Sequence, residues 1–384
     1  MLAPMKTLPP RLMFSQPVWL AASVLLVWNS VLAQAPVAAT DGTWVFTNPM
    51  NEKRESFTAT RLLDGQVLVA GGFVSGGSAE PGAELYDPVS NTWSRATAGF
   101  SAPRHAHEAV LLNDGRVLVA GGLFGVGLLT SQTYDPAIGA WSRTTLMNHQ
   151  HIDGRMTLLA DGRALMSGDI AFQKPKSVEI YDPETDTWSN TGSLNFGRSA
   201  HTATLLADGR VLVTGGEAGF NFVMRNDAEL YDPVTGTWRV TASMHHRRRF
   251  HAATLLEDGR VLVTGGLSRN SSGELSVNSA EIYDPTTEQW RMAPRFTFAR
   301  SFHQATLLLD GRVAITGGFN QGQIGQVEIY DPILRTWTSG GELNTPRDGN
   351  TATLLSDGRL LVAGGFGDGG TLRTAELGDL SDSP

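Results

Sequence analysis

L-L-A-D-G-R-V-L-V-T-G-G, from Leu205 to Gly216, consists of two apolar runs that flank an Asp-Gly pair. An Asp-Gly in this setting predicts a two-residue β-hairpin loop, because the favoured turn needs positive φ and both residues tolerate it. Close copies recur at intervals of 47 to 52 residues, and their Asp residues are Asp64, Asp114, Asp161, Asp208, Asp258, Asp310 and Asp357. This period predicts a repeat architecture, since so short a unit must stack on its neighbours to bury its faces.

The fullest unit predicts four antiparallel strands, at about residues 200–206, 210–215, 227–231 and 237–241. Apolar residues fill consecutive positions of the first two strands, which is typical of sheets covered on both faces. Tyr231-Asp232-Pro233 ends the third strand with residues that a type I turn favours. The connections from second to third strand, and from fourth strand to the next unit, vary in sequence and share one face, called the loop face below.

The repeated residues resemble the kelch repeat of β-propellers, in the bacterial form similar to the galactose oxidase central domain. A Gly pair ends the second strand of six units, and a Trp follows each Tyr of Tyr-Asp-Pro by seven residues. The six Tyr residues are Tyr86, Tyr134, Tyr181, Tyr231, Tyr283 and Tyr330. The resemblance covers nearly all of the chain after the first 40 residues, and it implies a ring of four-stranded blades.

The seventh unit starts at Arg347 and lacks its fourth strand, with Gly378 where the Tyr is expected and no Trp after it. Trp44 precedes Arg54 by ten residues, as Trp188 precedes Arg198. We therefore expect an all-β, seven-bladed propeller of four-stranded antiparallel blades, closed by an N-terminal strand that completes the last blade. Such closure leaves no sheet edge exposed where the ring joins.

Residues 1–35 have the features of a secretory signal peptide, and residues 36–384 are expected to form the propeller. Lys6 and Arg11 precede an apolar stretch, and small residues follow it at a suitable cleavage site. The alternative is an uncleaved anchor. Export predicts a secreted, periplasmic or cell-surface protein, without stable membrane insertion after cleavage. The formal charge of −8 becomes −10 without the two basic leader residues, which argues against nucleic-acid binding.

The galactose oxidase resemblance implies a copper site that uses tyrosines, one of them cross-linked to a cysteine. This chain has no Cys, and all six of its Tyr residues belong to the repeat. The residues therefore argue against galactose oxidase activity and predict no cofactor.

A basic residue stands ten positions before each Asp-Gly, where the first strand of each unit begins. His151 occupies this position in the third unit, and the other six residues are Arg54, Arg104, Arg198, Arg248, Arg300 and Arg347. Around a central channel, six guanidinium groups could bind carboxylate, sulfate or phosphate. The alternative is that each Arg belongs to the repeated scaffold.

Three further sets of residues are candidates for binding. His149, His151 and Asp153 alternate along an extended segment and could bind a metal, although this unit could simply have drifted from the repeat. His245, His246 and Arg247 form a basic cluster that could bind an anionic ligand or lie in a solvated loop. Four His residues follow the Arg positions by three residues and could bind a metal around a channel, but we expect one ring nitrogen of each to bond to the backbone: His107, His201, His251 and His303.

Two regular charges predict ion pairs between blades. An Arg follows the Asp-Gly in six units, and a Glu stands two residues before the Tyr position in six. If each Arg pairs with the Glu of the following blade, as in Arg210 with Glu281, the two exceptions Gln66 and Gln132 would meet each other.

The sequence predicts an exported binding module that takes a protein or carbohydrate ligand on its loop face, without evident catalysis. The alternative is an enzyme acting on carboxylated sugars, similar to kelch-type epimerases, that uses the Arg-rich loop face. A catalytic acid or base would then be needed beside the arginines. Asp153, Asp169, Glu217 and Asp227 are the candidates.

Overall fold

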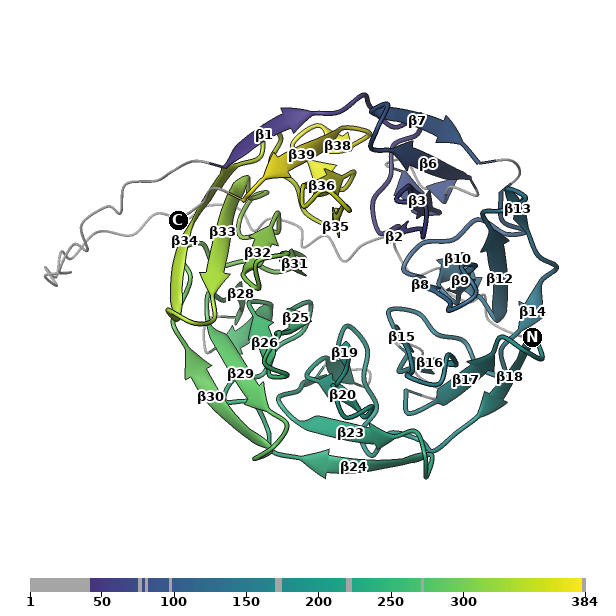
Figure 1. Cartoon of the computed structure of the whole chain (residues 1–384). Coiled ribbons are helices and arrows are strands. Elements are labelled where there is room, and N and C mark those ends of the chain that lie inside the picture. Colours follow the sequence, from purple (N-terminus) through teal and green to yellow (C-terminus); the bar gives the residue numbers. More distant parts are fainter. Residues whose placement is uncertain are drawn as a thin grey trace, which may run out of the picture. The chain divides into compact units, whose positions relative to one another are not determined.

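The computed structural model describes residues 42–74, 78–79, 82–96, 99–169, 175–218, 223–270 and 273–381. The leader expected at residues 1–35 lies outside these ranges. The described residues form strands and turns, and seven antiparallel sheets surround one axis (Figure 1). No helix in this part of the chain is long and apolar enough to cross a membrane. The prediction of an all-β, seven-bladed propeller is confirmed.

Each blade has its first strand nearest the axis (Figure 1). The first blade contains β2 (Thr58–Arg61), β3 (Val67–Ala70), β6 (Ala83–Asp87) and β7 (Thr92–Arg95). The second contains β8 (Glu108–Leu111), β9 (Val117–Ala120), β12 (Thr130–Asp135) and an outer strand in two pieces, β13 (Ala140–Trp141) and β14 (Thr145–Leu146). The third contains β15 (Arg155–Leu158), β16 (Ala164–Ser167), β17 (Val178–Asp182) and β18 (Thr187–Asn190).

The other four blades follow the same order. They contain β19 (Thr202–Leu205), β20 (Val211–Thr214), β23 (Ala228–Asp232) and β24 (Thr237–Thr241); β25 (Ala252–Leu255), β26 (Val261–Thr264), β29 (Ala280–Asp284) and β30 (Gln289–Ala293); β31 (Gln304–Leu307), β32 (Val313–Thr316), β33 (Gln326–Asp331) and β34 (Thr336–Glu342); and β35 (Thr351–Leu354), β36 (Leu360–Ala363), β39 (Ala375–Asp379) and β1 (Thr43–Phe46).

The core lies between blades, as consecutive apolar residues require. Val211, Val213 and Tyr231 of the fourth blade pack against Leu165 and Ile180 of the third. All six Tyr side chains are at most 1% exposed, and each ring lies about 5 Å from the Trp ring of its own blade. The repeated aromatic residues are therefore part of the scaffold.

The Asp-Gly turns differ from the predicted two-residue loops. In the fourth blade the Leu206 amide donates to the Arg210 carbonyl over 2.8 Å, and the Gly209 amide donates to the Leu206 carbonyl over 3.0 Å. Three residues therefore form the loop, and only its Gly has positive φ, 85° at Gly209. This is a type I turn followed by a left-handed glycine. Asp208 instead accepts the Arg210 amide at 3.0 Å, so its carboxylate fixes the turn.

The termini close the ring as predicted. β1 pairs antiparallel with β39, with Trp44 opposite Gly378. The Trp44 indole is 7% exposed, and its Nε1 donates to the Gly340 carbonyl of the sixth blade over 2.9 Å. An added Cβ at Gly378 would lie 2.6 Å from the Trp44 ring. The Trp44 ring thus occupies the space that a side chain at the usual Tyr position would need.

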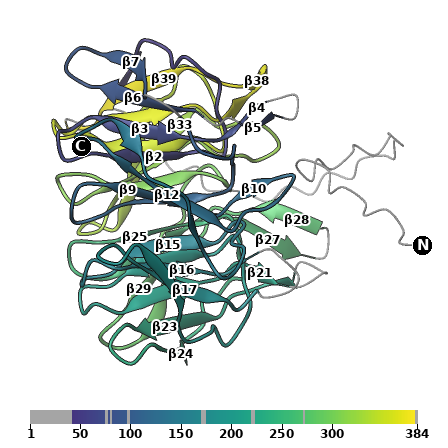
Figure 2. The ribbon, with the colours of Figure 1, turned by 90° about the vertical axis from the view of Figure 1, so that its right-hand side faces the viewer.

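Short hairpins project from one side of the ring, which is the loop face (Figure 2). They are β4–β5 (Phe73–Val74, Ser78–Ala79), β10–β11 (Leu123–Phe124, Val126–Gly127), β21–β22 (Glu217–Ala218, Val223–Met224), β27–β28 (Leu267–Asn270, Gly273–Ser276) and β37–β38 (Phe366–Gly367, Gly370–Thr371). The Asp-Gly and Tyr-Asp-Pro turns lie at the opposite strand ends, on what we call the turn face.

Candidate functional site

The six arginines predicted to surround the channel are buried inside the blades, each at most 1% exposed. Arg198 Nη1 donates to the Gly215 carbonyl over 2.8 Å, and its Nη2 lies 2.7 Å from Glu229 Oε1 and 2.6 Å from Asp227 Oδ1. Glu229 also accepts the backbone amides of Asn195 and Phe196 at 2.7 and 3.1 Å. The guanidinium group therefore joins the first strand of its blade to the third.

The same pair recurs within four other blades. Its distances are 3.0 Å for Arg54–Glu84, 2.7 Å for Arg248–Glu281, 2.9 Å for Arg300–Glu328 and 2.6 Å for Arg347–Glu376. Burial lowers the pKa of Arg300 to about 10, but the group stays charged at neutral pH. This is the geometry of the scaffold alternative, since the N–H groups that a ligand would need already bind carbonyls and glutamates.

The Glu partner predicted for Arg210 is wrong, although Arg210 does form an ion pair with the following blade. Arg210, which follows an Asp-Gly, lies 2.6 Å from Asp208 of its own turn and 3.0 Å from Glu288 of the next blade. Glu281, its expected partner, is held by Arg248. The pairing failed because the side chain two residues before the Tyr lies inside its own blade, beside the start of the first strand.

Two blades depart from the Arg–Glu pair. In the second, Gln132 replaces the Glu, and Arg104 donates to Gly121 O and to Thr130 O and Oγ1 at 2.8 to 3.1 Å. No described carboxylate pairs with Arg104, and burial lowers its pKa to about 10. In the third, His151 replaces the Arg, with Nδ1 2.7 Å from the Gly168 carbonyl and Nε2 3.3 Å from Glu179.

The structure does not bring the predicted metal ligands together. His151 already contacts Glu179 through its Nε2. Within the described ranges, no three His, Asp or Glu side chains form a group that could hold a metal. His149 and Asp153 therefore do not complete a site with it. The four other repeated His residues are buried, and each Nε2 meets a hydroxyl of the preceding blade, as in His303 with Thr264 at 2.8 Å. Burial lowers the pKa of His303 to about 3, so its ring is neutral.

The two histidines of the basic cluster at residues 245–247 bind Glu281. The amides of His245 and His246 donate to its carboxylate over 2.7 and 3.1 Å, and His245 Nδ1 lies 2.9 Å away. Arg247 is exposed. The two His backbones are thus part of the Arg248–Glu281 scaffold, while the His245 ring and Arg247 face solvent.

A closed ring of backbone hydrogen bonds surrounds the axis just before the innermost strands. Each member lies two residues after the Arg or His position, has φ between 50° and 59°, and donates its N–H to the carbonyl of the member in the preceding blade over 3.0 to 3.4 Å. Each blade supplies one member. In chain order they are Ser56, Ala106, Asp153, Ala200, Phe250, Phe302 and Gly349.

One part of this ring borders a group of charged side chains, and another part is aromatic. We call the surface that they form together the channel mouth; its residues are Glu108, Asp153, Arg155, Glu217, Arg249, Phe250 and Phe302. Arg155 Nη1 lies 2.9 Å from Glu108 and 2.8 Å from the Gly154 carbonyl. Arg249 binds Glu217 and, at 2.8 Å, Glu274. Burial raises the pKa of Glu108, Asp153 and Glu217, although Arg155 and Arg249 oppose the shift. Carboxyl groups are thus crowded beside arginines that already have partners.

Another part of the mouth is aromatic. The rings of Phe250 and Phe302 stack with centroids 4.1 Å apart, and Phe302 is 36% exposed. The Arg249 Cζ lies 5.2 Å from the Phe250 centroid. Exposed aromatic rings beside carboxylates can bind a ligand that has both apolar and polar or cationic parts.

The sequence interpretation missed most of the channel mouth. It named Asp153 as a metal ligand and Glu217 as a possible acid or base, but not Glu108, Arg155, Phe250 or Phe302. A signal was present, because the position two residues after each Arg or His varies from Ser to Asp to Phe, while that Arg recurs in six units and a His follows the variable position in four. Variable residues held by a constant frame are typical of binding surfaces.

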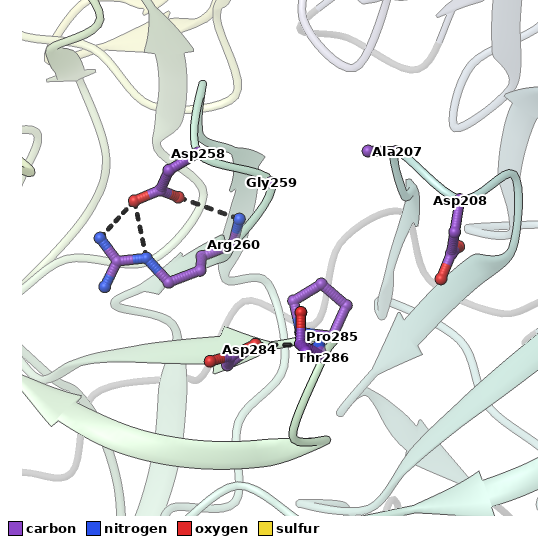
Figure 3. A pocket seen from close by; sticks show the side chains of 8 residues that line it. All are labelled: Ala207, Asp208, Asp258, Gly259, Arg260, Asp284, Pro285 and Thr286. Atoms are coloured by element: carbon purple, nitrogen blue, oxygen red, sulfur yellow. Dashed lines mark hydrogen bonds and ion pairs between the residues drawn. The ribbon is translucent and has the colours of Figure 1, made fainter.

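The turn face also has a hollow, of about 260 Å³, between the fourth and fifth blades (Figure 3). Asp208, Asp258 and Pro285 line it, and Asp258 is paired with Arg260 of its own turn. Asp208 and Asp258 belong to Asp-Gly turns, which recur in all seven blades, and Pro285 belongs to a Tyr-Asp-Pro turn, which recurs in six. The hollow therefore follows from the repeat, and its chemistry is not peculiar to one place in the ring.

Comparisons with known proteins agree with this architecture. A family model described as the KLHDC2/KLHL20/DRC7 kelch-repeats domain matches residues 155–365, and one described as the Kelch motif matches residues 56–98. No curated protein matches the sequence significantly. A fungal alcohol oxidase of the AA5 family, solved in complex with copper, is similar with a TM-score of 0.74 and 17% identity, over 88% of this chain and 76% of that one. Such a likeness shows a shared fold and leaves activity open.

Proposed function

Because the chain belongs to the kelch-repeat family of β-propellers, we propose that it is a binding module that takes a protein or carbohydrate ligand on its loop face. The channel mouth carries the proposal, since side chains of different chemistry occupy equivalent positions of a rigid ring there. The turn face, by contrast, repeats the same Asp-Gly and Tyr-Asp-Pro residues. Function in propellers depends on such local differences between equivalent blades.

Binding is favoured over the alternative of an enzyme that acts on carboxylated sugars. That enzyme would use free guanidinium groups on the loop face, whereas the arginines of the repeat bind glutamates and carbonyls inside the blades. A copper site built on tyrosines does not fit either, because every Tyr of the chain is buried against a Trp of its own blade.

Export is part of the proposal. The leader-like residues 1–35 support it, with a secreted, periplasmic or cell-surface location for residues 36–384. The acidic composition agrees with a role that involves neither nucleic acid nor an anionic membrane.

Matched variants on the two faces test the proposal. Ligands of the purified 36–384 protein would first be selected from displayed peptides and from a glycan array. Val126→Asp with Val223→Asp places charge on two loop-face hairpins, and Val89→Asp with Val234→Asp does so on two turns, all four side chains being at least 50% exposed. We expect the loop-face variant to lose affinity at least tenfold and the turn-face variant to keep it. The opposite pattern would overturn the proposal.

A further inference from the structure

We propose that the channel mouth binds the ammonium or guanidinium group of a basic side chain from a partner polypeptide, between Asp153 and the stacked rings of Phe250 and Phe302. The inference rests on the proposed function and narrows it to one chemistry at one place.

Asp153 supplies a negative charge without a partner. Among the described residues, its carboxylate makes no hydrogen bond or ion pair, and the side chain is partly exposed. The two arginines that interact electrostatically with Asp153 are already engaged, Arg155 by Glu108 and Arg249 by Glu217 and Glu274. An anionic ligand would therefore find no free guanidinium at the mouth, whereas a cation would neutralise a surplus carboxylate.

The aromatic pair lies close to this carboxylate along the ring. Asp153 and Phe250 both hydrogen-bond to Ala200, so one alanine separates them in the backbone ring. The faces of Phe250 and Phe302 attract cations through their quadrupoles. Arg249 already places its guanidinium 5.2 Å from the Phe250 centroid, so the outer ring available to a further cation is that of Phe302, which stacks on Phe250. A carboxylate beside aromatic faces matches an ammonium or guanidinium head.

A basic side chain fits better than an inorganic ion. The described residues contain no group of three carboxylate or His side chains that could hold a metal. Lys and Arg also have apolar stems, which can pack on Phe302, 36% exposed, while the charged head reaches Asp153. The aromatic wall and the single free carboxylate thus favour an organic cation on a short apolar stem.

Calorimetric titration of the 36–384 protein would test the inference with the amides of Nα-acetyl-lysine, Nα-acetyl-arginine and Nα-acetyl-norleucine. We expect either basic amide to bind at least tenfold more tightly than the neutral norleucine amide. Asp153→Asn should lose this preference, and asparagine tolerates the positive φ of the position. Phe302→Leu should weaken binding severalfold. Glu257→Gln removes one exposed carboxylate from the turn face and should leave the affinity within twofold.

Equal binding of the norleucine amide, or an unchanged affinity in Asp153→Asn, would overturn the inference. Glucosamine, whose ammonium group is carried by a sugar, would be titrated in the same way. If it binds and neither basic amide does, a polypeptide is not the source of the cation. A selected loop-face ligand that keeps its affinity for Asp153→Asn overturns this inference and leaves the proposed function standing. A ligand lost only in the turn-face variant overturns the proposed function instead.

Discussion

Arg198 Nη2 and Glu229 Oε1 meet at 2.7 Å, and neither side chain is exposed to solvent. The pair connects the start of the innermost strand of a blade to its third strand, and Arg198 also holds the Gly215 carbonyl between them. Four other blades contain the same pair. These repeated Arg–Glu pairs therefore act within blades, where they order the connections on the loop face.

Glu376→Gln should lower the free energy of unfolding by about 3 kcal/mol or more, because it leaves the buried Arg347 guanidinium without its counter-charge. Asp208→Asn is the matched control. Its carboxylate is 45% exposed, and exposed pairs contribute about 1 kcal/mol or less. Urea unfolding of the 36–384 protein would measure both. Equal losses in the two variants would contradict a structural role for the buried pair.

Gln132→Glu should raise the melting temperature. Arg104 is buried without a described carboxylate partner, and the substitution restores the residue found at the equivalent position of the other blades. The gain arises because a paired buried charge is more stable than an unpaired one. Gln66→Glu, in a hairpin turn, serves as the control and should change little. A lower melting temperature for Gln132→Glu would show that the contact of Gln132 with Ser142 matters more.

Gly378→Ala should destabilise the ring closure, although alanine normally suits a strand better than glycine. The new Cβ would lie 2.6 Å from the Trp44 indole, so the strand that closes the ring must shift. We expect a melting temperature several degrees lower. Gly369→Ala, where an added Cβ meets nothing within 4 Å, provides the comparison and should melt close to the parent protein.

Glu288 should make stability depend on pH in the acid range. Hydrogen bonds from Arg239, and then Arg210, lower its pKa from about 4.5 to about 2. A lowered folded-state pKa stabilises the protein above the unfolded value, and this contribution is lost as the pH falls from about 4.5 towards 2. The carboxylate is partly exposed, so about 1 kcal/mol is expected. Glu288→Gln should differ most from the parent near pH 7 and converge with it near pH 2.

The strands, their order and the closing strand followed from the sequence because apolar runs, turn residues and a fixed period all reflect local preference. The error at Asp208 was also local, since the sequence shows that a turn exists but not which residues carry positive φ. The wrong partner for Arg210 had another cause. Charges of both signs recur in every unit, so the sequence alone does not say which of them pair. Glu281 is taken by Arg248, whose side chain crosses its own blade as Arg198 does in the fourth.

The channel mouth was hidden for a different reason. Asp153 and Phe302 lie 149 positions apart in the chain, and the backbone ring that brings them near each other involves no characteristic side chain. Its members are as different as Ser56, Ala200 and Phe250. Pattern matching favours what is constant between repeats, and here the constant residues form the frame while the site depends on the residues that differ.

The closed backbone ring also determines where the electric field of the mouth comes from. Each of its seven peptide groups is a dipole, and hydrogen bonds align them head to tail around the axis. In a helix such dipoles add along one line and give each end a partial charge. Around a closed circle their tangential components cancel, so this frame has no positive or negative end. The sign of the potential that an approaching ligand meets is left to a few side chains, and evolution can reverse it without disturbing the fold.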